Sequence, residues 1–303
     1  MSTLAKLVLI ALAAAWAGSA GAADGNWQRV GEALGKPGTE LPGGIYKVSL
    51  PRTDIHATLD GVALQPGFAL GGWLAFAPMG GSSMVMGDLV LTEDEVNPVM
   101  AKLLAGGIRV TAVHNHLLRN RPFTMYMHVL GKGDPAKLAS VLHTALAASH
   151  TPLAPAASGS SQPAANSAPP PKLDLDTAAL DRAIGAKGKS NGGLYQYSIA
   201  RAVPVTEEGM RVPPAMGSAQ SVNFQPTGGG KAAITGDFVL TAQEVAPVMQ
   251  ALRDGGIEVT ALHNHMLDEQ PRLFFMHFWA DDDAAKLARG IGAALGHVAI
   301  AKQ

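Results

Sequence analysis

Six of the ten histidines stand in one pattern that occurs twice along the chain. Each occurrence is a His-Asn-His tripeptide followed by a third histidine: His114, His116 and His128 in the first, and His263, His265 and His277 in the second. Neutral imidazole nitrogens are common ligands of zinc and similar divalent ions, and three of them leave a fourth position for water or a carboxylate. The pattern therefore predicts a three-histidine metal site in each copy, with zinc as the first candidate.

The histidines need neighbouring β-strands to bring them together. Side chains two residues apart on a strand point to the same face, so His114 and His116 are predicted to share a face. His128 falls on the next strand of a presumed hairpin, and a register that places it beside His114 would make the three rings converge.

Two other interpretations of the histidines stay open. Duplication copies residues whether or not they are used, so the rings could be structural core residues. They could also act as a general acid and base in a cleft without any metal. Burying several polar rings without partners is costly, and this favours ligands or a functional role over a purely structural one.

Further residues are candidates for the same site. His56 and Glu95 are predicted to be catalytic, although Glu95 also fits a capping box with Thr92 at the start of a helix. Asp88 and Asp237 could each complete a metal site with a carboxylate. The first copy is the better candidate for activity, because the second has apolar or neutral residues in place of Asp54, His56, Glu93 and Asp94.

The repeat itself is the clearest feature of the chain. Residues 87–128 and 236–277, related by a constant shift of 149 positions, share 24 identities in 42 by direct count. The match weakens upstream, where Arg52 still lies opposite Arg201. A period this long indicates duplication of a whole domain and not a solenoid repeat.

Each copy is predicted to contain the order ββαββα. In the first copy we expect strands at 70–77 and 84–91, a helix from Thr92 that ends at Gly106-Gly107, strands at 108–116 and 123–130, and a helix at 134–148. This order predicts an α+β protein made of two tandem ferredoxin-like α/β sandwich domains with antiparallel sheets.

The ends of the two domains follow from composition. Residues 1–22 have the pattern of a signal peptide, with Lys6, an apolar run and the small residues Ala20-Gly21-Ala22. Residues 151–172 are rich in Pro, Ala and Ser, which is typical of a linker. We therefore predict a first repeat domain at 23–150, a second at 173–303, a periplasmic or secreted location, and no membrane span after signal cleavage.

Composition excludes several classes of function. The chain has no cysteine, so disulfides, thiolate metal sites and cysteine nucleophiles are excluded. Removing Lys6 from the 23 basic residues leaves 22 against 24 acidic residues, a net charge of −2. This charge gives no support to nucleic acid as a partner. The expected partner is an unknown small molecule or a component of the cell envelope.

The combined motifs resemble a known family. They are Tyr46, Arg52, the run Met86-Gly87-Asp88-Leu89-Val90-Leu91-Thr92, Pro98-Val99-Met100, Thr111-Ala112-Val113-His114-Asn115-His116 and Met127-His128. In these residues the chain is similar to the LppY/LpqO family of bacterial exported proteins, which is defined by a domain of unknown function. The resemblance covers nearly all of the mature chain and implies export and a duplicated domain, but no reaction.

Two functions are compatible with the sequence. One is a periplasmic or secreted protein whose histidines hold a divalent metal ion, with metal-dependent hydrolysis as its candidate reaction. The other is a non-catalytic binding module for cell-wall fragments or a partner protein, with structural histidines.

Overall fold

The computed structural model describes residues 27–153 and 173–301. The predicted signal peptide and residues 154–172 of the predicted linker lie outside this part. The first residues of the predicted linker pack on the first domain. Thr151 is buried, and the carbonyl of Pro152 accepts a hydrogen bond from Lys36 Nζ. Within the described residues no helix has the length and apolar character needed to cross a membrane.

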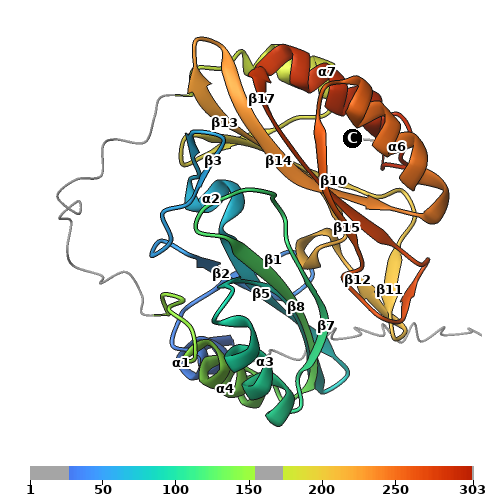
Figure 1. Cartoon of the computed structure of the whole chain (residues 1–303). Coiled ribbons are helices and arrows are strands. Elements are labelled where there is room, and N and C mark those ends of the chain that lie inside the picture. Colours follow the sequence, from blue (N-terminus) through green and yellow to red (C-terminus); the bar gives the residue numbers. More distant parts are fainter. Residues whose placement is uncertain (1–26, 154–172, 302–303) are drawn as a thin grey trace, which may run out of the picture.

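The first copy is a six-stranded antiparallel sheet with helices on one face (Figure 1). The strand order is β1-β2-β5-β6-β8-β7, and a short β3-β4 hairpin and helix α2 are inserted after β2. The elements are α1 (Trp27–Leu34), β1 (Thr39–Leu41), β2 (Ile45–Pro51), β3 (Thr58–Leu59), β4 (Val62–Ala63), α2 (Pro66–Ala69), β5 (Gly71–Met79), β6 (Ser82–Thr92), α3 (Val96–Ala105), β7 (Arg109–His114), β8 (Thr124–Gly133) and α4 (Pro135–Leu146).

The second copy repeats this sheet in the order β15-β17-β14-β13-β10-β9. It differs where β11, β12 and β16 form a separate three-stranded sheet. The elements are α5 (Thr177–Ile184), β9 (Lys189–Asn191), β10 (Leu194–Ala200), β11 (Val205–Glu207), β12 (Met210–Val212), the 3-10 helix η1 (Pro214–Met216), β13 (Ala219–Gly228), β14 (Lys231–Leu240), α6 (Ala242–Asp254), β15 (Glu258–His263), β16 (Glu269–Gln270), β17 (Phe274–Asp283) and α7 (Ala284–Leu295).

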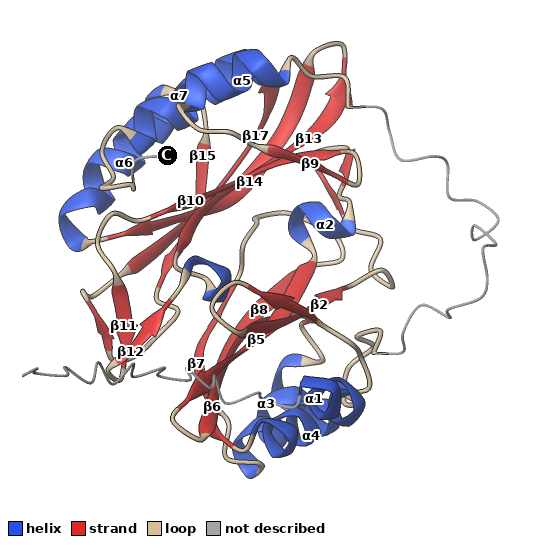
Figure 2. Ribbon diagram, turned by 180° about the vertical axis from the view of Figure 1, so that it is seen from behind, coloured by secondary structure: helices blue, strands red, loops and turns tan. Residues whose placement is uncertain are grey.

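The two sheets face each other with the short helices α2 and η1 between them, and the longer helices lie on the outside (Figure 2). The alternation of side chains along β6 explains this arrangement. Val85 and Leu89 point to the helices of their own domain, whereas Met84 and Met86 belong to a core shared with Met266 and other residues of the second copy. Because both faces of β6 are apolar, the strand is buried on both sides and the sheets must pack as neighbouring layers.

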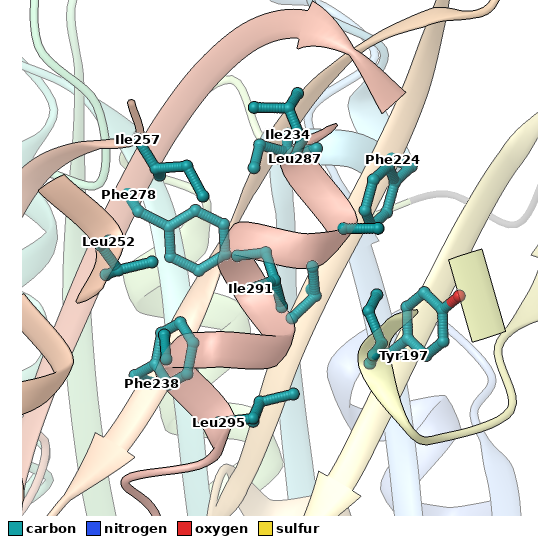
Figure 3. Close-up of a cluster of buried hydrophobic side chains, with 14 of the residues drawn as sticks. Tyr197, Phe224, Ile234, Phe238, Leu252, Ile257, Phe278, Leu287, Ile291 and Leu295 are labelled. Atoms are coloured by element: carbon teal, nitrogen blue, oxygen red, sulfur yellow. The ribbon is translucent and has the colours of Figure 1, made fainter. Parts of the chain in front are cut away.

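Each domain also has its own core between sheet and helices. In the second domain Phe224, Phe238 and Phe278 of the sheet pack against Leu287 and Ile291 of α7 (Figure 3). Burying side chains of this size stabilises each domain by roughly 1.5–3 kcal/mol per residue. These cores hold the sheets, and therefore the histidines, in fixed positions.

The sequence predicted much of this architecture. The α+β class, the two tandem domains and the antiparallel sheets are confirmed, and the predicted order ββαββα corresponds to β5, β6, α3, β7, β8 and α4. The ferredoxin-like sandwich stays a prediction, because each sheet gains two further strands and a further helix at its beginning. The short amphipathic helix α1 was not predicted.

Candidate metal centre between the two copies

The six patterned histidines meet at the interface of the two sheets. The closest imidazole neighbour of each ring belongs to the other copy. Ring centroids are 3.4 Å apart for His114 and His263, 3.8 Å for His116 and His277, and 3.6 Å for His128 and His265. Within the first copy His114 lies 5.1 Å from His116 and 5.0 Å from His128. The expectation of two separate sites therefore becomes one cluster to which both copies contribute.

A β-bulge in each copy explains how the two tripeptides come together. The register of β7 and β8 shifts between Val110 and Ala112, which leaves Thr111 unpaired, and Thr260 is the equivalent residue in β15. Thr111 Oγ1 donates to the carbonyl of His265 at 2.6 Å, and Thr260 Oγ1 donates to that of His116. The bulges thus bind the histidine segments of the opposite copy.

The asparagine of each tripeptide completes this cross-connection. Asn115 Nδ2 donates to the carbonyl of Thr260 at 3.1 Å, and Asn264 Nδ2 donates to that of Thr111 at 3.0 Å. The same amides also bond the carbonyls of Leu117 and Met266. The central residue of His-Asn-His is therefore a structural link between the copies, and the flanking histidines face the cluster.

The register differs from the expectation at one point. Tyr126 lies opposite His114, and His128 lies opposite Ala112 on one side and Asp88 on the other. Strand β7 ends at His114, so His116 follows the strand instead of belonging to it. The extra residue of the bulge moves the partner of His128 from Thr111 to Ala112, so that His114 and His128 lie on the same face of the sheet. Asp88 lies in the same row of side chains because β6 and β8 pair without a register shift.

In three of the six imidazole rings, the nitrogen Nδ1 contacts a backbone carbonyl oxygen. Nδ1 lies 3.1 Å from the carbonyl oxygen of Asn115 in His114, 2.9 Å from that of Asn264 in His263, and 2.8 Å from that of Gly236 in His277. A carbonyl can only accept, so Nδ1 carries the proton and Nε2 keeps its lone pair.

The six Nε2 atoms are buried, and none has a hydrogen-bond partner within residues 27–153 and 173–301. Burial, with a contribution from nearby imidazoles, lowers the pKa of His114 to about 3, and burial lowers that of His263 to about 4. The pKa values of the other four are also lowered well below the ordinary range, for the same reasons. The rings are therefore neutral at physiological pH, which is the state that binds metals.

Two aspartates border the histidines. Asp88 Oδ2 lies 3.6 Å from His116 Nε2, Asp88 Oδ1 lies 3.8 Å from His128 Nε2, and Asp237 Oδ2 lies 3.6 Å from His265 Nε2. These separations are too long for hydrogen bonds. Burial raises the pKa of Asp88 to about 8, and burial together with Asp88 raises that of Asp237 well above its ordinary value.

The ligand atoms lie close enough to share ions. One nitrogen each from His114, His263, His265 and His277 lie within 4.8 Å of one another. A second group of Asp88, His114 and His128 meets the same limit. Three of the four histidines in the first group come from the second copy and one from the first. No single copy supplies this set.

A cleft of about 880 Å³ connects the cluster with the surface. Asp88 and Asp237 line it together with four of the histidines, His116, His128, His265 and His277. The remaining walls come from both copies, with Lys47 and Trp73 on one side and Asn223 among the residues on the other. A small molecule can therefore approach both carboxylates.

Glu95 occupies a different environment from the histidines. Its carboxylate accepts hydrogen bonds from Arg52 Nη1 at 2.7 Å, Thr92 N at 2.9 Å and His150 N at 2.8 Å. Arg201 and Glu244 form the same pair in the second copy, where Glu244 also completes a capping box. The geometry therefore assigns Glu95 a clear structural function, and its catalytic role stays a prediction.

His56 is exposed, and it belongs to neither group of converging ligand atoms among the described residues. Asp54, two residues after Arg52, forms an ion pair with that arginine. Glu93 and Asp94 are exposed and also lie outside both groups, so the features that favoured the first copy do not contribute side chains to the cluster. The residues that sequence reasoning missed are Thr111, Thr260 and the two asparagines, whose only signal was their presence in both copies.

Comparison with known proteins agrees with a duplicated domain. The chain belongs to the family described as Domain of Unknown Function (DUF1259), which matches residues 28–148 and 178–297. The prediction of a duplicated domain of unknown function is confirmed, whereas the LppY/LpqO name stays a prediction. No curated protein matches the chain.

Two solved structures were compared with the fold. A trimeric bacterial microcompartment shell protein, PduB, is 12% identical, with 84% of this chain and 87% of that chain covered and a TM-score of 0.19. EtuB from Clostridium kluyveri is 9% identical, with 85% and 90% covered and a TM-score of 0.19. Scores this low support no conclusion about function.

Proposed function

We propose that the protein binds a divalent transition-metal ion, zinc foremost, in a centre that both copies build together. The observation that carries the proposal is the convergence of six buried Nε2 atoms that have no hydrogen-bond partner in the described chain. Leaving a buried polar atom unpaired costs roughly 1–3 kcal/mol. Such costs in one place are best explained by metal ions that these atoms bind, and five of the six histidines belong to the two groups of ligand atoms that lie within 4.8 Å of one another.

The distances support this interpretation. Ligand atoms held about 2.1 Å from one tetrahedral ion lie about 3.4 Å from each other. The separations of 3.6 and 3.8 Å between Asp88 and its two histidines are close to that value. The ligand atoms of the four-histidine group also lie close together, within 4.8 Å of one another.

The donor set also indicates which metals fit. Imidazole nitrogens with carboxylate oxygens suit zinc, copper, iron and nickel better than calcium or magnesium. The carbonyl oxygens behind His114, His263 and His277 supply the outer contacts that orient metal-binding imidazoles. Six histidines and two aspartates exceed the four donors of one tetrahedral ion, so the centre has donors for a second.

A metal-dependent hydrolase is the reaction class that we propose for this centre. Its support is the cleft, which brings a small molecule to Asp88 and Asp237 beside the histidines. A metal in such an open position lowers the pKa of bound water toward 7 and polarises a carbonyl or phosphoryl oxygen.

We propose a periplasmic or secreted location on the basis of the leader pattern with Lys6.

Substitution of one histidine from each copy tests the shared centre. In His114→Gln and in His263→Gln the metal affinity should fall by more than the roughly 10–100-fold that the loss of an outer-shell partner causes. The matched control is His297→Gln, which changes an exposed histidine outside the cluster. Competition with a chromophoric chelator measures the affinity. Undiminished affinity in either cluster variant would contradict a centre to which both copies contribute.

A further inference from the structure

The cleft has a positively charged wall that belongs to the first copy alone. Along β2, Tyr46 and Val48 point to the helix-side core, whereas Lys47 and Ser49 line the cleft. Lys36, just before β1, lines the same wall. The second copy has Gln196 at the position of Lys47. The Gln196 side chain donates hydrogen bonds from Nε2 to the carbonyl of Gly67 and to Oδ1 of Asn223.

The ammonium group of Lys47 is partly buried without a counter-ion. Its Nζ donates to the carbonyl of Ala215 at 2.9 Å and lies 4.5 Å from the centre of the Trp73 ring. In the parts of the chain that the structure describes, Lys47 forms no ion pair with a carboxylate, and neither does Lys36. Burial lowers the pKa of Lys47 to about 8 and also lowers that of Lys36. A cation in this environment gains stability when an anion approaches.

The lysine lies on the path to the proposed metal centre. Ser49 pairs with Trp73 across the strands, Trp73 pairs with Asp88, and Asp88 pairs with His128. Lys47 is two residues along β2 from Ser49, so its Cα lies roughly 12 Å from that of Asp88 by ordinary strand spacings. The long side chain of Lys47 shortens this gap, so a small metabolite can contact the Lys47 ammonium and the Asp88 carboxylate at once.

We propose that Lys47, assisted by Lys36, binds an oxyanion group, carboxylate or phosphate, of the molecule that enters this cleft. The proposal rests on the proposed function only in identifying that molecule as the substrate of the metal centre. The anion site itself consists of the ammonium groups of Lys47 and Lys36, and the carbonyl of Ala215 contributes only by accepting a hydrogen bond that orients Lys47. Lysine ammonium groups bind such oxygens through charge-assisted hydrogen bonds, and the Trp73 ring holds the ammonium in place.

Direct binding of two simple anions tests this site. Calorimetry with inorganic phosphate and with acetate is carried out on the full mature chain, both after chelator treatment and after loading with zinc. We expect saturable binding of at least one anion in both forms, and a loss of about tenfold or more in Lys47→Met. The matched control Gln196→Met, at the equivalent position of the second copy, should keep the affinity of the wild type. Preference between the two anions distinguishes a phosphate from a carboxylate ligand.

A measurement on the unaltered protein covers the case in which Lys47→Met does not fold. With a pKa near 8, Lys47 should react early with an amine-acylating reagent, and the preferred anion should slow its modification more than that of exposed lysines such as Lys286. Peptide mass spectrometry measures both rates. Absence of anion binding to the wild type, or equal binding in Lys47→Met, or no protection of Lys47, would overturn the proposal.

The metal content of the same samples separates the two proposals. Anion binding that depends on Lys47 in a protein with no affinity for metals would overturn the metal centre and leave the anion site standing. Metal binding combined with anion affinity that does not depend on Lys47 would overturn the anion site alone.

Discussion

The buried ion pair of Arg52 and Glu95 permits a prediction that decides between two functions of the glutamate. The side chains are 1% and 3% exposed. Burial alone would raise the pKa of Glu95, but hydrogen bonds from Arg52, His150 and Thr92 lower it to about 2, from an ordinary value of 4.5. The substitution Glu95→Gln removes the charge and keeps the shape.

The size of the effect follows from the pKa. A difference of about 2.5 between the unfolded and folded pKa values corresponds to about 3.5 kcal/mol of stability at neutral pH, at about 1.4 kcal/mol per unit. This contribution is complete above the unfolded value of 4.5 and is lost as the pH falls through the folded value near 2. Breaking a buried pair costs a similar 3–5 kcal/mol or so, because Arg52 is left without its partner.

Thermal unfolding at pH 7 and at pH 3 measures this prediction. We expect Glu95→Gln to lower the melting temperature at pH 7 by roughly 10 °C and by less at pH 3. Glu244→Gln is the matched variant in the second copy, whose glutamate pairs with Arg201 in the same way. An unchanged melting temperature at pH 7 would refute the reasoning, and if activity were lost at the same time it would favour the predicted catalytic role of Glu95.

Three further predictions concern the interface. Thr260→Val removes the hydroxyl that bonds the carbonyl of His116 and should lower the free energy of unfolding by about 1 kcal/mol, as measured by urea denaturation; no change would show that this link contributes nothing. Asp88→Asn should weaken metal binding, measured by chelator competition, by more than the roughly 10–100-fold that the loss of an outer contact causes; Asp237→Asn should give a loss of the same order, and unaltered affinity in both variants would show that the aspartates are not metal ligands. Treatment with a chelator should lower the melting temperature, because metal at 100 times its dissociation constant stabilises the folded state by about 2.7 kcal/mol; equal melting curves with and without chelator would argue against binding to the folded state.

The local structure was predictable because local rules control it. The apolar run of β6 beside a glycine-rich turn and the helical spacing of Val99 and Leu103 indicate their elements without any tertiary information. Gly107, with a φ of 77°, ends its helix in the conformation that glycine favours. The six histidines and Asp88 were also identified from their recurrence in both copies.

The joining of the two copies was not predictable from these patterns. It depends on which faces of the two sheets pack together, and that is decided by shared burial of residues such as Met84 and Met266. One signal was present, since apolar residues on both faces of β6 indicate a second covering layer. The bulge at Thr111 gave no such signal, because a single extra residue changes the register without changing the hydrophobic pattern.

The most direct test of the shared metal centre is metal analysis combined with X-ray absorption spectroscopy on the untagged protein. The structure leads us to expect at least one bound transition-metal ion per chain, with imidazole nitrogens near 2 Å as its main ligands. The spectrum should lose imidazole scattering both in His114→Gln and in His277→Gln, since each copy supplies ligands. Protein without bound zinc, copper, iron or manganese, and without a thermal shift when these ions are added, would contradict the proposal.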